Sequence, residues 1–430
     1  MRPFDVIVIG SGPGGATVAR ELARAGKQTL ILERGADHYP RAHYGTYLGA
    51  LLYTDRASLL FTEEGQNIIR PMLVGGATSM YCGCAARPPR WFKTKYGIDL
   101  SAEASETIEE LEIAPLPADL RGAASTQIAE AGRALGQGWE PQMKFMRPLR
   151  ARRFDCGAKC MIGCRCGAKW NAREFVMEAI ERGAELRTGA HIKRVLMEGG
   201  RAAGVEGTLN GRPFTAKAET VIVAAGGIGS PRLLQASGFR DAGNGITMDT
   251  TVMVYGLRKQ RGNGHEPPMT WSWDNDEVGY KLSTLIDPWL LYPLMAALKH
   301  TRYALFWPRW NDILGVMIKL KDDVSGGVFP NRISKPMTAS DQERLRLAED
   351  VARRILLEAG ADRATLFTTP LRGTHPSSSV RIGALLDSDL QTEVKGLYVC
   401  DASTFPEALG QPTVLTIISL AKRLARHLLR

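Results

Sequence analysis

The sequence predicts an α/β protein with two domains, the first of which is discontinuous along the chain. Three observations support this fold class. A strand, a glycine-rich turn and a helix open the chain, a strand and a closing helix of the same kind end it, and the stretch between them has a different composition. With 430 residues, of which 44% are hydrophobic and 23% charged, the chain is long enough for two hydrophobic cores, which excludes a disordered or fibrous protein.

The opening unit has the pattern of a nucleotide-binding βαβ motif. A β-branched run at residues 5–9 predicts a strand, the turn Gly-Ser-Gly-Pro-Gly-Gly fills residues 10–15, and residues 16–25 have the periodicity of a helix. A second strand over residues 28–32 ends in Glu33. The glycines allow the backbone to approach a pyrophosphate closely, and an acidic residue at this spacing accepts hydrogen bonds from a ribose. A chance glycine turn lacks this combination, so we predict a Rossmann-like nucleotide site here.

The rest of the chain divides by composition. Between residues 236 and 374 tryptophan is dense and no glycine fingerprint occurs, which favours a separate α+β substrate-binding domain. We therefore expect a cofactor domain formed by residues 1–235 and 375–430, with a Cys-rich segment at 156–166 inside it. The elements expected beyond the opening unit are a helix at 172–182, strands at 191–197, 204–209, 213–217, 219–223 and 396–401, and a closing helix at 413–429.

Further segments resemble the signatures of the glucose-methanol-choline (GMC) family of flavin oxidoreductases. Residues 75–79, Gly-Gly-Ala-Thr-Ser, are similar to the first signature, and residues 226–234, Gly-Gly-Ile-Gly-Ser-Pro-Arg-Leu-Leu, to the second. The segments 375–383, 401–406 and 410–417 are similar to the catalytic region of the family almost position by position. The resemblance covers the cofactor framework, about half of the chain, and implies a fold like that of cholesterol oxidase and other GMC enzymes.

The resemblance implies FAD as the cofactor and gives the predicted site residues their roles. His375 matches the catalytic base beside the flavin, and Gln411 matches its partner, at a position where the family commonly has Asn or His. Tyr81 stands where the first signature commonly has Asn, and no histidine lies beside that signature, so FAD is expected to be held noncovalently. The predicted cofactor-binding residues are Gly10, Gly12, Gly14, Gly15, Glu33, Arg34, Gly75, Gly76, Ser79, Val195, Ala225, Asp401, Ala402, Pro412 and Thr413.

These features predict an FAD-dependent oxidoreductase that takes hydride from the CH–OH group of an apolar or glycosidic alcohol, with His375 as the base. An imidazole can accept a hydroxyl proton near neutral pH, whereas the Gln411 amide can only orient the substrate oxygen. Two alternatives stay open. One is a flavin-dependent double-bond reductase or isomerase, which the altered Gln411 favours. The other is a flavoprotein electron-transfer subunit whose partner carries out the substrate chemistry.

Seven cysteines occur, and four of them, Cys156, Cys160, Cys164 and Cys166, fall within eleven residues. Their spacing is unlike the common ferredoxin and zinc-ribbon patterns. Basic neighbours stabilise thiolates and would offset the charge of a metal cluster. Iron-sulfur ligation by these four cysteines is therefore one interpretation, and structural thiols or a disulfide are the other. The charged residues around them are Arg147, Arg150, Arg152, Arg153, Asp155, Lys159, Arg165 and Lys169.

The formal net charge of +10 is compatible with an anionic partner, such as an acidic protein that accepts electrons. A quinone is the alternative electron acceptor. No nucleic-acid-binding signature accompanies the charge. The N-terminus enters the first strand almost at once, which leaves no room for a secretory signal and predicts a cytoplasmic protein. The apolar run at 288–298 is too short to span a bilayer. The aromatic segment 289–310 favours either a membrane-interface or lid segment or a buried helix, so peripheral membrane contact stays open.

Overall fold

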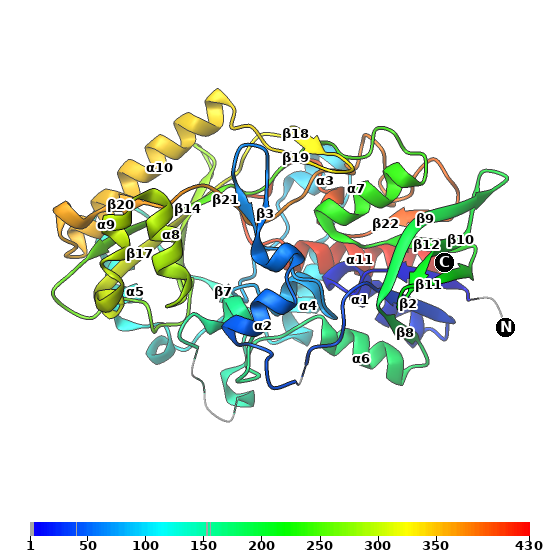
Figure 1. Cartoon of the computed structure of the whole chain (residues 1–430), viewed down its shortest axis with the longest axis horizontal. Helices are drawn as coiled ribbons and strands as arrows, with labels where there is room; N and C mark the ends of the chain where they lie inside the picture. The colour runs from blue at the N-terminus through cyan, green and yellow to red at the C-terminus, as the bar shows by residue number, and fades with distance from the viewer. Residues whose placement is uncertain (1–3, 40, 152–153, 155) are drawn as a thin grey trace.

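Two sheets lie side by side along the long axis of the molecule in the computed structural model, which describes residues 4–39, 41–151, 154 and 156–430 (Figure 1). A five-stranded sheet lies at the right of the view and a nine-stranded sheet at the left. The predicted α/β class, with a Rossmann-like part and a second part of mixed strands and helices, is confirmed.

The five-stranded sheet is parallel and has the strand order β22-β12-β1-β2-β8. Its central strands are mostly apolar, and β1, β2 and all of β12 except Thr220 are buried, as expected for parallel strands that are covered on both faces. The last strand in the sequence pairs with β12, so the C-terminal segment joins the sheet that the opening unit begins. The strands are β1 (Val6–Ile9), β2 (Thr29–Glu33), β8 (Glu185–Thr188), β12 (Thr220–Val223) and β22 (Leu397–Val399).

Helices and an antiparallel meander cover this sheet. The first helix, α1, packs against α6 and α11. Its buried Arg20 lies over the Phe175 ring, 3.4 Å from the ring centroid, and donates a hydrogen bond to Glu110. The meander contacts the sheet through its first two strands. The helices are α1 (Pro13–Arg24), α4 (Ser101–Glu110), α6 (Arg173–Glu181), α7 (Gly226–Ala236) and α11 (Val414–Leu428), and the meander is β9 (Ala190–Glu198), β10 (Arg201–Leu209) and β11 (Arg212–Lys217).

The nine-stranded sheet is mostly antiparallel and has the order β3-β4-β21-β14-β17-β16-β15-β6, with β20 paired to β14. Three of its strands precede residue 236, so it takes strands from both stretches of the chain that the composition separates. The strands are β3 (Leu60–Phe61), β4 (Asn67–Ile68), β6 (Glu140–Pro141), β14 (Thr251–Leu257), β15 (Trp271–Asn275), β16 (Tyr280–Thr284), β17 (Ile313–Leu320), β20 (Phe367–Thr368) and β21 (Arg372–Gly373).

Alternating side chains of β14 enter two different cores. Val252 and Val254 pack with α5 (Ala123–Ala134) and the long helix α10 (Ala339–Glu358). Met253 and Tyr255 belong to the second core, which includes residues of α8 (Leu291–Lys299) and α9 (Thr301–Ala304). Because successive side chains of a strand point to opposite faces, the sheet separates these two cores.

The remaining elements are short. A three-stranded sheet is formed by β13 (Asn244–Ile246), β18 (Ser325–Val328) and β19 (Ile333–Ser334), and β5 (Ala114–Pro115) pairs with β7 (Met143–Lys144). The short helices are α2 (Tyr47–Leu52) and α3 (Trp91–Tyr96). Within the described residues, every helix is too short or too polar to cross a lipid bilayer.

Candidate active site

A cavity of about 510 Å³ lies at the carboxyl ends of the parallel strands. Its walls come from the glycine turn after β1, the end of β2, the turn after β12 and residues 68–73. The segment 374–376 closes the wall near the nine-stranded sheet. In an open parallel sheet, ligands bind outside the carboxyl ends of the strands, so this cavity is the candidate site.

The glycines of the turn have two different surroundings: some lie against neighbouring backbone, and one borders the cavity. Gly10 has a φ of +107°, and a Cβ atom there would lie 2.2 Å from the carbonyl oxygen of Ala224. At Gly14 the Cβ would lie 1.9 Å from the carbonyl oxygen of Cys400. At Gly12, by contrast, nothing lies within 4 Å of the added atom. Gly10 and Gly14 are therefore required by the neighbouring strands, whereas Gly12 borders open space in which a ligand fits.

Two buried carboxylates hold the turns of the cavity wall. Glu33 accepts hydrogen bonds from Ser11 N at 3.0 Å, Ser11 Oγ at 2.6 Å and Gly35 N at 2.7 Å. Asp401 accepts from Gly226 N at 2.8 Å, and also from Ser230 Oγ and Ser403 N. Burial raises the pKa of both carboxyl groups, and these hydrogen bonds act in the opposite direction.

The cavity wall also carries a group of basic side chains, of which Arg70 and Lys193 lie outside the sequence motifs. One of them, Arg70, is held by an ion pair with Asp55 at 3.0 Å. Several positive groups around one cavity favour an anionic ligand such as a diphosphate. Together with the predicted Arg34, the basic residues of the wall are Arg70, Lys193 and Arg232.

Most of the fifteen predicted cofactor residues line the cavity, and five do not. The five are Gly15, Gly75, Ser79, Val195 and Pro412. Gly15 packs against Gly10. The Ser79 hydroxyl accepts a hydrogen bond from Asn171, and the Val195 amide donates to the Ser237 hydroxyl. The residues that line the cavity are Gly10, Gly12, Gly14, Glu33, Arg34, Gly76, Ala225, Asp401, Ala402 and Thr413.

His375 lies in the wall of the same cavity and is paired with a carboxylate. Its Nδ1 lies 2.7 Å from Oδ2 of Asp249, a residue that is 126 positions earlier in the chain. The Asp249 side chain is only 1% exposed, whereas His375 keeps 26% of its side-chain surface accessible. With Nδ1 turned to Asp249, Nε2 is the ring nitrogen left for a substrate.

A buried lysine completes the surroundings of this pair. Lys319 on β17 donates to Thr374 Oγ1 at 2.8 Å and lies 3.5 Å from Nδ1 of His375. Burial lowers the pKa of His375 and the Lys319 ammonium lowers it further, while Asp249 acts in the opposite direction. The imidazole is therefore neutral at pH 7 and able to accept a proton.

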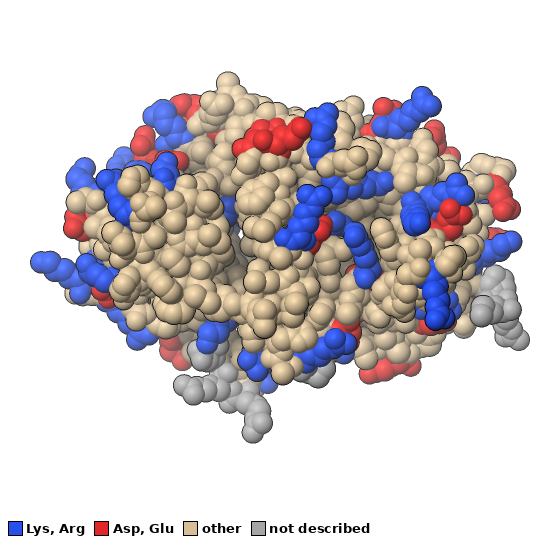
Figure 2. All heavy atoms as spheres, in the orientation of Figure 1, with Lys and Arg blue, Asp and Glu red and all other residues tan. Residues whose placement is uncertain are grey.

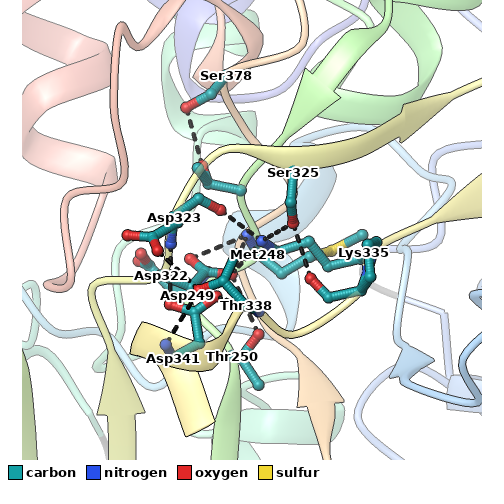
Figure 3. A network of polar contacts seen from close by, with 12 residues as sticks. Met248, Asp249, Thr250, Asp322, Asp323, Ser325, Lys335, Thr338, Asp341 and Ser378 are labelled. Carbon is teal, nitrogen blue, oxygen red and sulfur yellow. Dashed lines mark hydrogen bonds and ion pairs between the residues drawn. The ribbon is translucent and has the colours of Figure 1, made fainter. Parts of the chain in front are cut away.

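The turn that carries Asp249 is fixed by a second buried carboxylate. Asp249 has a φ of +45°, a left-handed conformation that is costly for a residue other than glycine. Asp322 accepts hydrogen bonds from the amides of Met248 and Asp249 at 3.0 and 2.9 Å and from Thr250 Oγ1 at 3.1 Å. Lys335, which is fully buried, lies 3.2 Å from Asp322 (Figure 3). This ion pair stabilises the turn on which the position of His375 depends.

The main chain beside Gln411 contacts the Asp249 carboxylate. The amide of Gly410, one residue earlier, donates to Oδ1 of Asp249 at 3.0 Å. Gln411 is partly exposed. Asp249, a residue for which the sequence carries no motif, thus contacts His375 and the residue before Gln411, whereas Gln411 itself is not among the residues that line the cavity.

The clustered cysteines give no support to the iron-sulfur prediction. In the described part of the chain, no group of three or more His, Cys, Asp or Glu side chains is arranged to hold a metal ion. Cys160 is hydrogen-bonded to Cys156 and to Cys82, and these bonds lower its pKa. Sγ of Cys164 lies 3.5 Å from Sγ of Cys166. This contact, together with the Lys169 ammonium and backbone amides and against the effect of burial, lowers the pKa of Cys164 to about 6. Three of the charges predicted around the cluster, Arg152, Arg153 and Asp155, lie outside the described residues.

Lys169, in the same segment, has a structural role. Its buried ammonium donates to the carbonyl oxygens of Ser79, Tyr81 and Cys160 at 2.8 to 3.0 Å. These bonds tie the Cys-rich segment to the loop after the first signature, and residues 76–77 of that signature line the cavity. The Cys-rich segment thus stabilises the loop whose residues 76–77 form part of the cavity wall.

Comparison with known proteins identifies the family. A sequence model of the GMC oxidoreductase N-terminal region matches residues 5–254, and one of the C-terminal region matches residues 333–421. The chain belongs to the GMC oxidoreductase family. The resemblance found in its motifs is confirmed, and the chain is an oxidoreductase by family.

The relatives of this GMC protein include proteins with and without a described activity. An uncharacterized protein of Methanocaldococcus jannaschii is 28% identical over 99% of this chain and all of its own. A long-chain-alcohol oxidase of Arabidopsis thaliana is 24% identical over 97% of this chain and 66% of its own. The crystal structure of pyridoxine 4-oxidase from Mesorbium loti superimposes with a TM-score of 0.72 at 15% identity, covering 99% of both chains, which shows the shared fold.

The buried pair behind Asp249 allows a test of its energetic role. Asp322→Asn leaves the Lys335 ammonium without its carboxylate, and we expect the free energy of unfolding to fall by about 3–5 kcal/mol, as for other broken buried pairs. Lys335→Met should cost a similar amount, and the double variant less than the sum of the two. Urea unfolding of the holoprotein measures all three.

The matched control is Glu343→Gln, because Glu343 pairs with Arg346 where both side chains are more than half exposed. Its effect should stay below about 1 kcal/mol. Strictly additive losses in the Asp322 and Lys335 variants would show that the two side chains do not stabilise the turn as a pair.

Proposed function

We propose that this protein is an FAD-dependent oxidoreductase that takes hydride from the CH–OH carbon of an apolar or glycosidic alcohol, with His375 as the base. The observation that carries the proposal is the 2.7 Å contact between His375 and the buried Asp249 in the wall of the cavity that the glycine turn opens. The long-chain-alcohol oxidase among the relatives supports an alcohol as the substrate.

The residues of the cavity fit FAD held without a covalent bond. The open space beside Gly12 and the amino end of α1 suit a pyrophosphate, because helix N-terminal amides attract anions. Glu33 retains acceptor capacity for ribose hydroxyls beyond its bonds to Ser11 and Gly35. Arg70 and Lys193 add positive charge to the wall. When bound, FAD supplies the acceptor for the hydride that the alcohol carbon loses.

Proton removal falls to His375. Asp249 accepts the Nδ1 proton, which keeps Nε2 free to take the proton of the substrate hydroxyl. The imidazolium that forms is stabilised by the Asp249 carboxylate, which the amide of Gly410 holds in place. Gln411 orients the substrate oxygen through its amide and cannot itself take the proton.

The two alternatives make different predictions about substrate. A double-bond reductase or an electron-transfer subunit does not have its flavin bleached by an alcohol. Anaerobic mixing of the holoprotein with medium- and long-chain primary alcohols and with alkyl glycosides therefore separates the proposed alcohol oxidation from both alternatives. Reoxidation by oxygen, compared with reoxidation by a soluble quinone, then identifies the electron acceptor.

Gly12→Val tests the cofactor site. An added Cβ at Gly12 has no protein atom within 4 Å, and the branched side chain occupies the space proposed for the pyrophosphate, so we expect a folded protein that is purified with little or no FAD. The 450 nm absorbance and circular dichroism of the purified variant measure flavin content and folding. Gly138→Ala, where an added Cβ has 4.0 Å to its nearest neighbour, is the control and should keep its FAD. Full flavin content in Gly12→Val contradicts the assignment.

His375→Ala tests the base. Flavin reduction by a verified alcohol should slow by roughly a hundredfold or more, the scale of a lost general base, while FAD stays bound. Gln411→Ala should slow reduction less and weaken substrate binding. Stopped-flow reduction under anaerobic conditions gives both quantities. Reduction of His375→Ala at the parent rate would reject this mechanism.

The pH dependence of reduction follows from the lowered pKa of His375. The neutral imidazole is the active form, so the rate should be constant above about pH 7 and fall only as the pH drops below 6.5, the ordinary pKa of histidine. Asp249→Asn removes the group that raises this pKa, so the acidic limb should move to lower pH while the plateau rate falls. Asp274→Asn, at an exposed position, is the control and should change neither.

A further inference from the structure

The exposed apolar residues of this protein are concentrated on two segments. Eighteen large hydrophobic side chains are exposed in the described residues, and twelve of them lie within residues 39–69 and 289–305, about a ninth of the chain. Chance scatter over the surface would not give this concentration, and contiguous exposed apolar surface marks an interaction site. The members with the largest exposure are Leu48, Leu51 and Leu52 of α2, Leu59 after it, Leu294 and Leu298 of α8, and Leu305.

The two segments adjoin one another. The amide of Leu290, at the start of α8, donates to the Tyr47 hydroxyl, at the start of α2, at 3.3 Å. Trp289, the residue before Leu290, packs against Trp307, with the ring centroids 4.7 Å apart. We call the surface formed by α2, residues 59–61 and residues 289–305 the apolar platform. In Figure 2 the area over α2 and α8 is mostly tan, with lysine and arginine around it.

The helix α8 shows why this surface is more than ordinary exposed leucine. Tyr292, Met295 and Ala296 are buried on its inner side, yet Leu294 and Leu298 on the outer side are 55% and 57% exposed. A helix that is apolar all round is normally buried. Here the inner side is covered by the protein and the outer side is left for an apolar partner.

The charges at the platform select the kind of partner. Within the platform as defined, Lys299 and Arg302 are basic and no residue is acidic. Arg56 and Asp55 lie beside it in the sequence, and Asp55 is paired with Arg70. A symmetric pair of copies would bring the positive charge of both platforms into one interface with no acidic residue of the platform to offset it. Leucine and tryptophan with a basic margin suit the surface of an anionic bilayer, where the apolar groups enter the acyl boundary and the basic groups meet the headgroups.

We propose that the apolar platform docks this protein onto the surface of an anionic lipid bilayer. The platform adjoins the cavity through the pairing of β3 with β4, because Leu60 of the platform lies opposite Ile68, which lines the cavity. If the substrate is an apolar alcohol, as in the proposed function, docking brings the cavity to the phase in which that substrate dissolves. This last step rests on the proposed function, whereas bilayer binding is tested without any substrate.

The experiment is flotation of the FAD-loaded protein with vesicles of phosphatidylcholine alone and of phosphatidylcholine with 30% phosphatidylglycerol (roughly the anionic content needed for surface attraction). We expect binding to the anionic vesicles, weaker binding to the neutral ones, and loss of the difference at about 0.5 M salt, where charges are screened. The variant L48S/L51S/L294S/L298S should partition at least about tenfold more weakly, because four apolar anchors are lost.

The matched control is M197S/L429S, which removes two exposed apolar residues from the sheet and helix at the other end of the molecule. It should bind as the parent does. Flavin content and thermal unfolding of both variants check folding. The proposal is overturned if the four-leucine variant binds like the parent, or if the parent fails to bind anionic vesicles. In the second case, a dimer that light scattering detects and that this variant abolishes assigns the platform to a second copy of the chain. A parent that binds vesicles but is not reduced by any alcohol retains the docking surface and rejects the proposed function.

Discussion

The ion pair between Asp322 and Lys335 is the interaction on which the candidate active site depends. Both side chains are fully buried, and the carboxylate gathers the donors of the turn at residues 248–250. A buried carboxylate is costly unless it is paired and hydrogen-bonded, and here both conditions are met. In return, the turn holds Asp249 in a left-handed conformation, and the carbonyl oxygen of Met248 accepts the amides of Thr374 and His375.

The cofactor end of the cavity is governed by a steric constraint instead. The glycine turn threads between the carbonyl oxygens of residues 224 and 400, which leave no space for a side chain at Gly10 or Gly14. The two carboxylates Glu33 and Asp401 then fix the turns that follow β1 and β12. The wall is therefore preorganised by protein contacts before a ligand enters, and the ligand meets backbone amides and basic side chains rather than mobile loops.

The Cys-rich segment lies outside the cavity and is hydrogen-bonded to a loop that forms part of the cavity wall. Lys169 joins this segment to the first signature through three carbonyl oxygens, and Lys144 donates to the carbonyl oxygens of Cys82 and Pro268 and to Sγ of Cys84. Two buried ammonium groups among thiols stabilise thiolate at the lowest-pKa cysteines. Of the basic residues that surround the cysteines in the sequence, Lys169 is held in this way, whereas Arg147 and Arg150 pair with Glu174 and Glu112.

The sequence by itself determined the features that are written in local spacing. The glycine turn, Glu33 and the segments around His375 and Asp401 are recognisable because their chemistry needs fixed residue types at fixed separations. The tertiary structure decided which residues contact these segments. Asp249 and Lys319 meet His375 because β14 and β17 pair with Thr251 opposite Lys319, and Asp322 and Lys335 follow on the connections beyond. Strand register brings together residues far apart in the chain, and no spacing within the sequence encodes it.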